Sequence, residues 1–266
     1  MIDLRLGDCC DIMSHHMQEE SVDLVVTSPP YDNLRQYNGK IDSWSIDKCR
    51  EVIKCLYRVV KDGGVVVWVV GDATINGSET GTSFKHALMF MEEGFNLHDT
   101  MIWRKTNPMP KVKTKRYFDC FEYMFVFSKG TPKTFNPIMI ECKSGGKVYD
   151  GTCKNMGGEN GRTHKTFTLN KERFKDNIWD IGVAQNKTVH PAVFPLQIAL
   201  DHISSWSGEG DTVFDPFTGS GTTALACLRL NRNFIGSELD ETYYDIAKGQ
   251  IEDLEKELSV RKKELF

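Results

Sequence analysis

Hydrophobic positions along this chain fall into two patterns, short continuously apolar runs and longer segments with helical spacing. Residues 22–28 (VDLVVTS) and 64–72 (GVVVWVVGD) have the apolar runs of buried strands. Residues 46–61 repeat apolar positions at helical spacing, and the Asp-Gly-Gly stretch at 62–64 is a stop signal for that helix. Strands that alternate with helices are typical of βα units, so the pattern predicts an α/β fold with a mainly parallel sheet.

The pattern continues on both sides of an irregular region. A helix is predicted at 83–94, followed by strands at 95–105 and 121–130, for which an antiparallel pair is one arrangement. Further helices are predicted at 194–207, opened by Pro195 near its first turn, and along the charged tail from 241. Residues 211–240 read as strand, glycine-rich turn, helix and strand.

Regular spacing stops between about 135 and 189, where Gly, Lys, Asn and Thr dominate. We therefore expect an inserted, loop-rich lobe at 135–189, between two regular segments at 1–134 and 190–266. The chain of 266 residues is 40% hydrophobic, which is ample for a packed core.

Composition narrows the class of protein. The longest fully apolar run, residues 65–70, is far too short to cross a bilayer. The first residues lack the basic and apolar regions of a signal peptide, so we expect a cytoplasmic protein. None of the eight cysteines forms a C-x-x-C pair, and the spacing of Cys142, Cys153 and His164 fits no common zinc pattern. We expect no metal site.

Charge is distributed unevenly. The net charge of −4 by itself argues against a nucleic-acid partner. However, residues 101–175 carry 16 Lys and Arg against six Asp and Glu, whereas the rest of the chain carries 17 against 31. This basic block is a candidate phosphate-binding face, and a solvated surface with uneven charge is the alternative.

A glycine-rich turn near the C-terminus has the features of a nucleotide-cofactor site. Residues 215–221 (DPFTGSG) connect a predicted strand to a helix, and Gly219 and Gly221 allow a sharp turn with close ligand approach. Glu238 ends the next predicted strand, about 20 residues on, where an acidic residue binds ribose hydroxyls in nucleotide-binding folds.

The turn lacks features that would indicate a pyrophosphate. Ala224 stands where the dinucleotide fingerprint has its third glycine, and no Lys follows the second glycine. A nucleoside cofactor without phosphates fits better, and S-adenosylmethionine is such a cofactor. Asp215 is then a candidate partner for its ammonium group.

The stretch Thr27-Ser28-Pro29-Pro30-Tyr31 ends the first apolar strand with a rigid tip. Pro30 has no amide hydrogen, so the Pro29 carbonyl and the Ser28 hydroxyl are two acceptors for the N–H groups of one exocyclic amine. Tyr31 offers a stacking face for a base, and a base in a duplex must be flipped out to reach such a site. A strand-ending turn with a packed aromatic ring is the alternative, and the glycine turn and basic block disfavour it.

Two segments resemble the amino-methylating DNA methyltransferases, which modify cytosine N4 or adenine N6: TSPPY at 27–31 and FDPFTGSGTT at 214–223. Their order is similar to the beta arrangement of that family. The resemblance covers nearly the whole chain outside about 135–189. It implies a Rossmann-like S-adenosylmethionine-dependent methyltransferase fold, circularly permuted, with an inserted target-recognition lobe.

The resemblance also assigns roles to residues and segments. It implies that 1–134 is the catalytic half of the domain, 135–189 the target-recognition lobe and 190–266 the cofactor-binding half. The catalytic residues are Ser28, Pro29, Pro30 and Tyr31. The residues expected near the cofactor are Asp8, His190, Ala192, Phe194, Asp215, Phe217, Gly219, Gly221, Thr222 and Glu238. The cations expected to contact DNA phosphates are Lys111, Lys113, Lys115 and Arg116.

In the family resembled, Ser-Pro-Pro-Tyr more often accompanies cytosine N4, so the expected substrate is a cytosine in double-stranded DNA, with adenine N6 as the alternative. Methylation at cytosine C5 is disfavoured because the chain has no Pro-Cys pair. The resemblance leaves open a cognate restriction endonuclease that acts separately and a homodimer. A DNA-binding regulator without turnover and an RNA or small-molecule methyltransferase are the rival classes.

Overall fold

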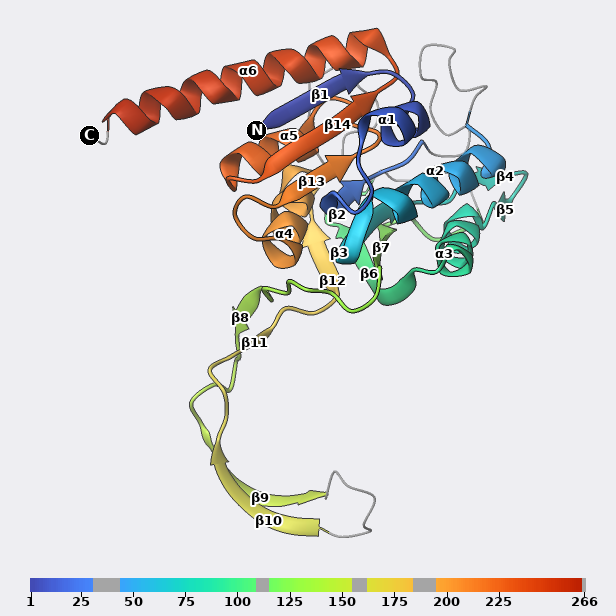
Figure 1. Ribbon diagram of the computed structural model, residues 1–266. Coiled ribbons are helices and arrows are strands. Elements are labelled where there is room, and N and C mark those ends of the chain that lie inside the picture. Colours follow the sequence, from blue (N-terminus) through green and yellow to red (C-terminus); the bar gives the residue numbers. More distant parts are fainter. Residues whose placement is uncertain (31–43, 109–114, 155–161, 184–194, 265–266) are drawn as a thin grey trace. The chain divides into compact units, whose positions relative to one another are not determined.

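The central element of the protein is an eight-stranded sheet (Figure 1). The computed structural model describes residues 1–30, 44–108, 115–154, 162–183 and 195–264. The strand order is β1-β14-β13-β2-β3-β7-β6-β12, and neighbours are parallel except where β7 pairs with β3 and β6. The strands span β1 (Ile2–Leu6), β14 (Asn233–Glu238), β13 (Thr212–Asp215), β2 (Val22–Thr27), β3 (Val60–Val70), β7 (Phe121–Ser128), β6 (Asn96–Lys105) and β12 (Ile178–Ile181).

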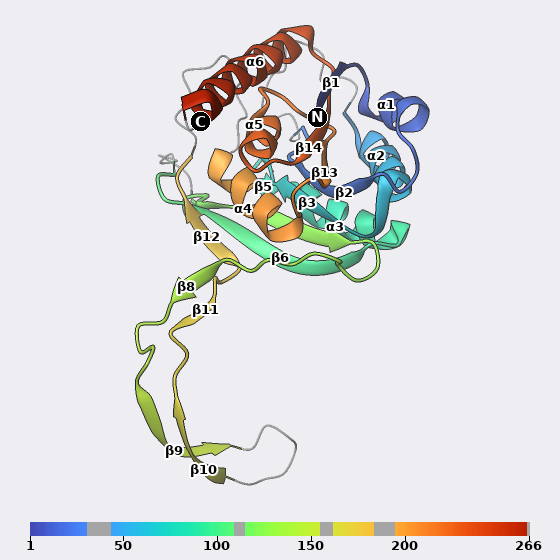
Figure 2. The ribbon, with the colours of Figure 1, turned by 60° about the vertical axis from the view of Figure 1, so that its left-hand side comes forward.

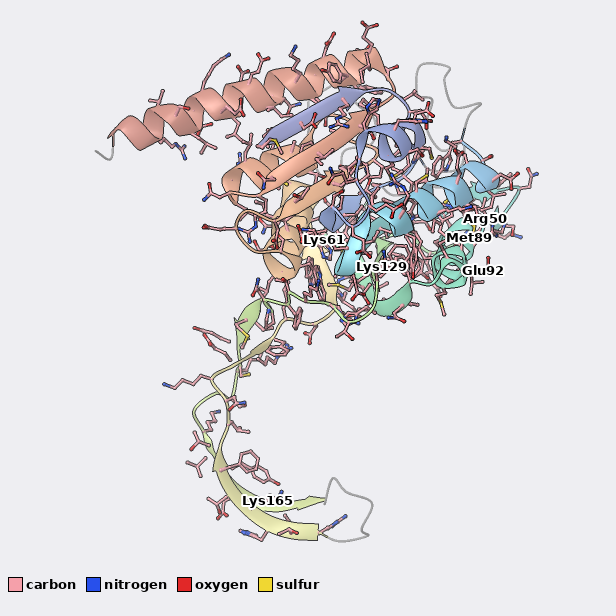
Figure 3. All side chains as sticks on the ribbon, viewed as in Figure 1. Arg50, Lys61, Met89, Glu92, Lys129 and Lys165 are labelled. Atoms are coloured by element: carbon pink, nitrogen blue, oxygen red, sulfur yellow. The ribbon has the colours of Figure 1, made fainter. Side chains whose placement is uncertain are left out.

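Helices cover both faces of this sheet (Figure 2). One layer contains α1 (Cys9–His16), α2 (Ile46–Val59) and α3 (Thr82–Glu93), and the other contains α4 (Leu196–Trp206), α5 (Thr222–Arg229) and α6 (Glu241–Glu264). The central strands are therefore buried on both sides, which explains why β2 and β3 are apolar runs without alternation. At the surface, Arg50 of α2 and Glu92 of α3 form an ion pair of 2.7 Å (Figure 3).

The predicted helix stop at 62–64 lies inside a strand. α2 already ends at Val59, and β3 starts at Val60 instead of residue 64. The register between β2 and β3 shifts here, because Val22 pairs with Val60 but Leu24 pairs with Val65. The two glycines thus lie in an irregularity of β3, an interior strand between β2 and β7. In the sequence, glycines at such a bulge look the same as glycines that end a helix.

Most other predicted elements are confirmed. The strands expected at 95–105 and 121–130 are β6 and β7, and they pair antiparallel. The glycine-rich turn connects β13 to α5 as predicted. Two short strands, β4 (Thr74–Ile75) and β5 (Ser78–Glu79), form a hairpin that the pattern did not predict.

The inserted region has more β-structure than the sequence indicated. Residues 137–176 form a compact unit of their own, while residues 177–183 return to the main sheet and include β12. Inside this second unit, β8 (Met139–Glu141) pairs with β11 (Glu172–Phe174), and β9 (Val148–Lys154) pairs with β10 (Arg162–Thr168). The expected loop-rich lobe at 135–189 is therefore shorter and consists of antiparallel ribbons.

These ribbons were missed for a physical reason. Every residue of β10 is exposed, so the strand has no buried face and no apolar alternation to detect. Among the helices that the structure describes, none is long and apolar enough to cross a membrane.

Candidate active site

Four parallel strands end at one edge of the main sheet, and the segments after them carry predicted site residues. β1 and β14 pair in parallel up to Leu6 and Glu238, and β13 pairs in parallel with both β14 and β2. Asp8 follows β1, Ser28 follows β2, and the turn at 216–221 follows β13. This edge is where α/β folds bind ligands, so the fold brings these segments together as predicted.

The glycine turn has the backbone that the sequence predicted. Gly219 and Gly221 have φ angles of +53° and +93°, which are rarely adopted by residues with side chains. A Cβ on Gly221 would also lie 3.3 Å from Ala247 of α6. The turn is closed by a hydrogen bond from the Gly221 amide to the Thr218 carbonyl, 2.9 Å long. Both glycines are thus required by the conformation.

Glu238 lies directly beside the turn. One carboxylate oxygen accepts a hydrogen bond from the Gly219 amide at 2.8 Å, and the other accepts from the Asp240 amide at 2.9 Å. Burial raises the pKa of this carboxyl, and the two amide hydrogen bonds oppose that rise. The side chain is a fixed acceptor at the end of β14, as expected for a residue that binds ribose hydroxyls.

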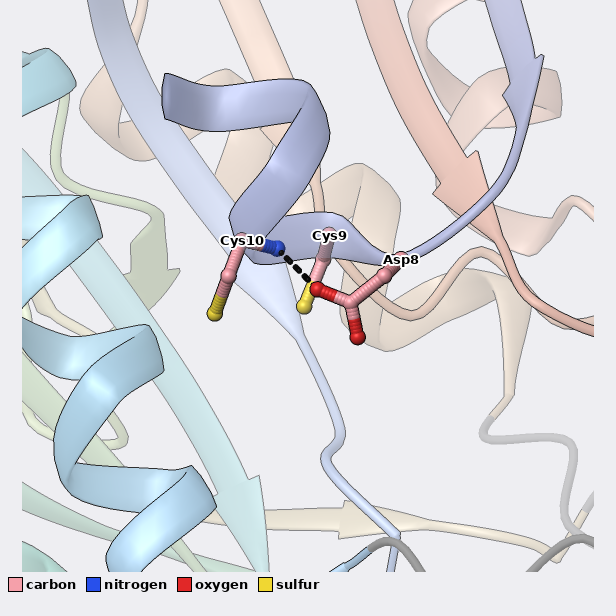
Figure 4. A group of neighbouring side chains, drawn as sticks. All are labelled: Asp8, Cys9 and Cys10. Carbon is pink, nitrogen blue, oxygen red and sulfur yellow. Dashed lines mark hydrogen bonds between the residues drawn. The ribbon is translucent and has the colours of Figure 1, made fainter. Parts of the chain in front are cut away.

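Asp8 caps the first helix, where its side chain lies beside Cys9 and Cys10 (Figure 4), and it also pairs with a lysine. Its Oδ1 accepts from the Cys10 amide at 2.8 Å and from the Lys48 ammonium at 3.1 Å. Leu6 and Glu238 are neighbours in the β1–β14 pair, so Asp8 follows β1 close to Glu238 at the end of the adjacent strand. The two carboxylates therefore line the same part of the sheet edge.

The side chains of Asp8, Cys9 and Cys10 also form a group whose potential metal-ligand atoms lie within 4.8 Å of one another. A hydrogen bond with Cys55 lowers the pKa of Cys10, but a hydrogen bond with Cys9 and burial raise it to about 12. With Asp8 occupied by Lys48, the group is better explained as packing at the start of α1.

The structure gives Asp215 different partners from those the sequence suggested. Its Oδ1 accepts from the Thr27 hydroxyl at 2.6 Å and the Phe217 amide at 3.0 Å, and its Oδ2 accepts from the Thr223 hydroxyl at 2.7 Å. The residue is 1% exposed, and burial raises its pKa to about 6. The carboxylate therefore faces the interior and does not offer itself to a cofactor ammonium.

These contacts connect the two predicted motifs. Thr27 directly precedes Ser28, while Asp215 opens the glycine turn and Thr223 lies in the first turn of α5. The Thr223 hydroxyl also contacts the Val26 carbonyl at 3.3 Å. Sequence reasoning missed both threonines, although Thr27 is a polar residue inside an apolar run. The network fixes the end of β2 against the start of the turn.

The tip after β2 is positioned by this network. Ser28 and Pro30 are half-buried and Pro29 is buried. Thr27 pairs with Trp68 on β3, so the tip is held from both neighbouring strands. The Tyr31 ring lies outside the described residues, and its stacking role stays a prediction.

Aromatic rings of neighbouring elements pack against Phe217 of the glycine turn. Phe217 contacts Trp44 edge-on, with ring centroids 5.2 Å apart, and Trp68 at 6.1 Å. The Trp68 indole N–H is hydrogen-bonded to His86 at 3.2 Å. The predicted Phe217 thus packs where the turn meets the first helical layer. Thr222 is the half-buried first residue of α5.

An ion pair at the same sheet edge was not predicted. The Lys105 ammonium lies 2.7 Å from Glu122 Oε1 and 5.3 Å from the centre of the Trp103 ring. β6 ends at Lys105 and β7 starts at Phe121, and the added Cβ of Gly71 would lie 3.3 Å from the Glu122 side chain. Gly71 follows β3, the neighbour of β2. The signal in the sequence was Glu122, a charged residue in the mostly apolar strand β7.

The structure describes only two of the four predicted phosphate-binding cations, Lys115 and Arg116. Lys115 is exposed, while Arg116 donates to the Gly77 carbonyl at 3.0 Å and pairs with Glu79 on the small β4–β5 hairpin. The Arg116 guanidinium is therefore partly neutralised by its own chain. The other predicted residues Lys111, Lys113, His190, Ala192 and Phe194 lie outside the described residues.

Comparison with known proteins decides the family. The family model N6_N4_Mtase, a DNA methylase, matches residues 22–249. The orphan methyltransferase M.BamHII of Bacillus amyloliquefaciens is 48% identical over 260 residues, which cover 94% of this chain and 91% of that protein. The chain belongs to the N6/N4 DNA methylase family. The Type II methyltransferase M.SmaI of Serratia marcescens is 28% identical and covers 88% of this methylase and 86% of its own length.

Solved structures agree on the fold. The M1.HpyAVI–SAM complex matches with a TM-score of 0.64 at 27% identity, covering 94% of this methylase and 99% of that chain. The PvuII DNA methyltransferase, named cytosine-N4-specific, matches with a TM-score of 0.69 at 20% identity, covering 95% and 90%. The predicted methyltransferase fold and the family's cofactor, S-adenosylmethionine, are confirmed, while the circular permutation stays a prediction.

Proposed function

We propose that this methylase transfers a methyl group from S-adenosylmethionine to the N4 amine of a cytosine flipped out of duplex DNA. One observation carries the proposal: the Asp215 carboxylate binds Thr27, next to Ser28, and also Thr223, next to the glycine turn. A single buried group thus holds the acceptor tip and the cofactor turn together. The Ser at position 28 favours cytosine over adenine, because Ser-Pro-Pro-Tyr resembles the cytosine-modifying members of the family.

The residues at the sheet edge fit the adenosine part of the cofactor. Asp8 and Glu238 supply carboxylates at the ends of adjacent strands, and Gly219 and Gly221 let the backbone approach a ligand closely. We assign the adenine amine to Asp8 and the ribose hydroxyls to Glu238. We also assign His190, Ala192 and Phe194 to the methionine end. When bound, S-adenosylmethionine supplies an electrophilic methyl group on a positively charged sulfur.

The acceptor amine is oriented by the tip. The Ser28 hydroxyl and the Pro29 carbonyl accept its two hydrogens, which turns the nitrogen lone pair out of conjugation with the ring and toward the methyl group. Tyr31 stacks on the flipped base. Transfer is direct and depends on positioning and electrostatic alignment. The methylated nitrogen then releases a proton to water through Ser28 or Asp32.

Duplex DNA is the proposed partner because residues 101–175 carry 16 Lys and Arg against six Asp and Glu, which concentrates basic charge in this part of the chain. Lys111, Lys113 and Lys115 contact phosphates in this scheme, whereas Arg116 is already paired with Glu79. The unit at 137–176 takes the role of target recognition.

The test is tritium transfer from labelled S-adenosylmethionine to duplex DNA, RNA and free nucleosides, followed by hydrolysis and identification of the labelled base. We expect label only in duplex DNA and only as N4-methylcytosine. N6-methyladenine as the product would contradict the cytosine assignment, and label in RNA or nucleosides would contradict the DNA substrate.

Ser28→Ala is the matched variant for this test. It removes one acceptor from the tip and leaves the residues of the glycine turn unchanged, so we expect unchanged cofactor affinity and a methylation rate lowered by about 100-fold, the size typical of one positioned catalytic group. Methylation at the parental rate would contradict the role of Ser28.

A further inference from the structure

The ribbon formed by β9 and β10 has two chemically different faces. Seven residue pairs hold it together, from Val148 opposite Thr168 to Lys154 opposite Arg162. Successive side chains of a strand point to opposite faces, and directly paired residues share a face. The register therefore assigns each side chain to one face or the other.

One face is polar. Asp150 pairs with Thr166, and Thr152 pairs with His164. The Thr166 hydroxyl donates to Asp150 Oδ1 at 2.7 Å, and His164 Nε2 lies 3.6 Å from the same oxygen. All four side chains are exposed. We call these four residues the polar face.

The opposite face is aromatic. Tyr149 pairs with Phe167, with ring centroids 5.1 Å apart, and Lys165 pairs with Gly151. A Cβ added to Gly151 would lie 3.0 Å from the Tyr149 hydroxyl, so the Tyr149 ring lies over the glycine. We call Tyr149, Phe167 and Lys165 the aromatic face, and Figure 3 labels Lys165 on the ribbon. Its rings pack on each other across the strands and stiffen the ribbon.

Among the described residues of 137–176, none buries the four short side chains of the polar face, which all stay exposed. Two hydroxyls, a carboxylate and an imidazole supply both donors and acceptors on a rigid surface. A two-stranded ribbon is also one of the two elements that fit the major groove of B-DNA, which is about 12 Å wide. The unit carries eight Lys and Arg against five Asp and Glu, so its charge is complementary to DNA.

We infer that the β9–β10 ribbon enters the major groove with its polar face toward the bases and reads the recognition sequence through Asp150, Thr152, His164 and Thr166. Carboxylates accept from cytosine N4, and Thr side chains contact base edges and the thymine methyl group. The aromatic face then points away from the base edges. This inference rests on the proposed function, since it names how that enzyme selects its DNA site.

The experiment uses the full-length enzyme and measures specificity as a ratio. The wild-type recognition sequence is first mapped by single-molecule sequencing of DNA from a methylation-free host that expresses the enzyme. kcat/KM is then measured on duplexes with the mapped site and with each single base-pair change. The ratio of the two values cancels any general loss of activity.

The variants Asp150→Asn and Thr152→Val change the polar face, and Lys165→Ala is the matched control on the aromatic face. We expect at least one polar-face variant to lower discrimination by about 5- to 150-fold at one or two base pairs, the share of a single base contact. The control should keep the wild-type ratios at every position.

Unchanged ratios in both polar-face variants would overturn the inference, and so would altered ratios in the control alone. Each variant should unfold at the wild-type temperature, because all the changed side chains are exposed. If the wild-type enzyme methylates no DNA, the proposed function fails, which is a separate result from unchanged specificity in an active enzyme.

Discussion

Asp215 accepts hydrogen bonds from three groups in two distant parts of the sequence, and it shows how a single residue can hold this site together. Thr27 belongs to the first half of the chain, while Phe217 and Thr223 follow Asp215 on the turn and helix. The carboxylate is too buried to serve a ligand directly. It acts instead as a positioning residue for Ser28 and for the glycine turn.

Removal of one donor should therefore weaken both folding and catalysis. Thr27→Val takes away the hydroxyl and leaves Asp215 with fewer partners, so we expect the free energy of unfolding to fall by about 1–3 kcal/mol. Methylation should slow more than cofactor affinity falls. Urea unfolding and single-turnover kinetics measure the two effects. The control Thr27→Ser keeps the hydroxyl and should stay within about 1 kcal/mol of wild type.

Titration of Asp215 gives a prediction with a definite sign. Burial raises its pKa from an ordinary value of 3.8 to about 6 in the folded state. The stabilisation from the protonated form is therefore complete below pH 3.8 and is lost as the pH rises through 6. Between these limits, wild-type stability relative to Asp215→Asn should fall by about 3 kcal/mol as the pH rises.

The measurement is urea unfolding of both proteins from pH 4 to 7, compared at each pH. Subtracting the unfolding free energy of Asp215→Asn from that of the wild type at each pH removes the contribution of all other carboxyls. A difference that stays flat, or that increases with pH, would show that this carboxyl titrates normally in the folded protein.

At the scale of elements, the strand–turn–helix unit around β13 and α5 depends on backbone conformation. Gly221→Ala puts a Cβ at a φ of +93° and 3.3 Å from Ala247. We expect a loss of about 1–2 kcal/mol in unfolding free energy and weaker cofactor binding, because the turn must shift. Chemical denaturation and calorimetric titration with S-adenosylmethionine measure these changes.

Gly249 provides a matched control in α6. A Cβ there meets nothing within 4 Å, and the residue lies inside a helix. Gly249→Ala should therefore stabilise the protein by about 1 kcal/mol and leave cofactor binding unchanged. If Gly221→Ala and Gly249→Ala changed the unfolding free energy and the cofactor affinity equally, the claim that the turn requires a glycine at position 221 would be contradicted.

Elements with a strong apolar pattern could be predicted from the sequence, and elements without one could not. The sequence predicted β2 and β3 because they are buried apolar runs. It predicted the β13–turn–α5 unit because of the glycines in its turn. The exposed ribbons at 137–176 have neither. The bulge at 62–64 resembled a helix stop because glycine serves both purposes.

The candidate site shows the same division. The glycine turn, Glu238 and the tip at 28–30 could be proposed from the sequence because their residue types and order suffice to suggest a ligand. The role of Asp215 could not be found, because it depends on Thr27, which is 188 positions away in the chain. Lys105 and Glu122 likewise form a pair only once β6 and β7 are side by side.

At the scale of the whole molecule, the chain divides its charge unevenly between two units. Residues 137–176 carry eight Lys and Arg against five Asp and Glu, while the rest of the chain carries 25 against 32. The larger unit contains the whole sheet edge described above. Cofactor binding and DNA recognition should therefore be separable.

Deletion of the second unit tests this separation. The Lys175 amide is hydrogen-bonded to the Ile138 carbonyl at 2.8 Å, so the two ends of the unit are adjacent and a short Gly-Ser linker can join residues 136 and 177. We expect the shortened protein to unfold cooperatively and to bind S-adenosylmethionine with wild-type affinity. Its methylation of DNA at the mapped site should be lost. Loss of cofactor binding would contradict the independence of the larger unit.

The most direct test of the account is a crystal structure of the enzyme with S-adenosylmethionine. We predict that the adenosine lies along Asp8 and Glu238, that Gly219 and Gly221 contact the cofactor, and that its methyl group faces Ser28 and the Pro29 carbonyl. A methyl group that points away from this tip, or a cofactor bound elsewhere than at the glycine turn, would contradict the claim that the two motifs form one methyl-transfer site.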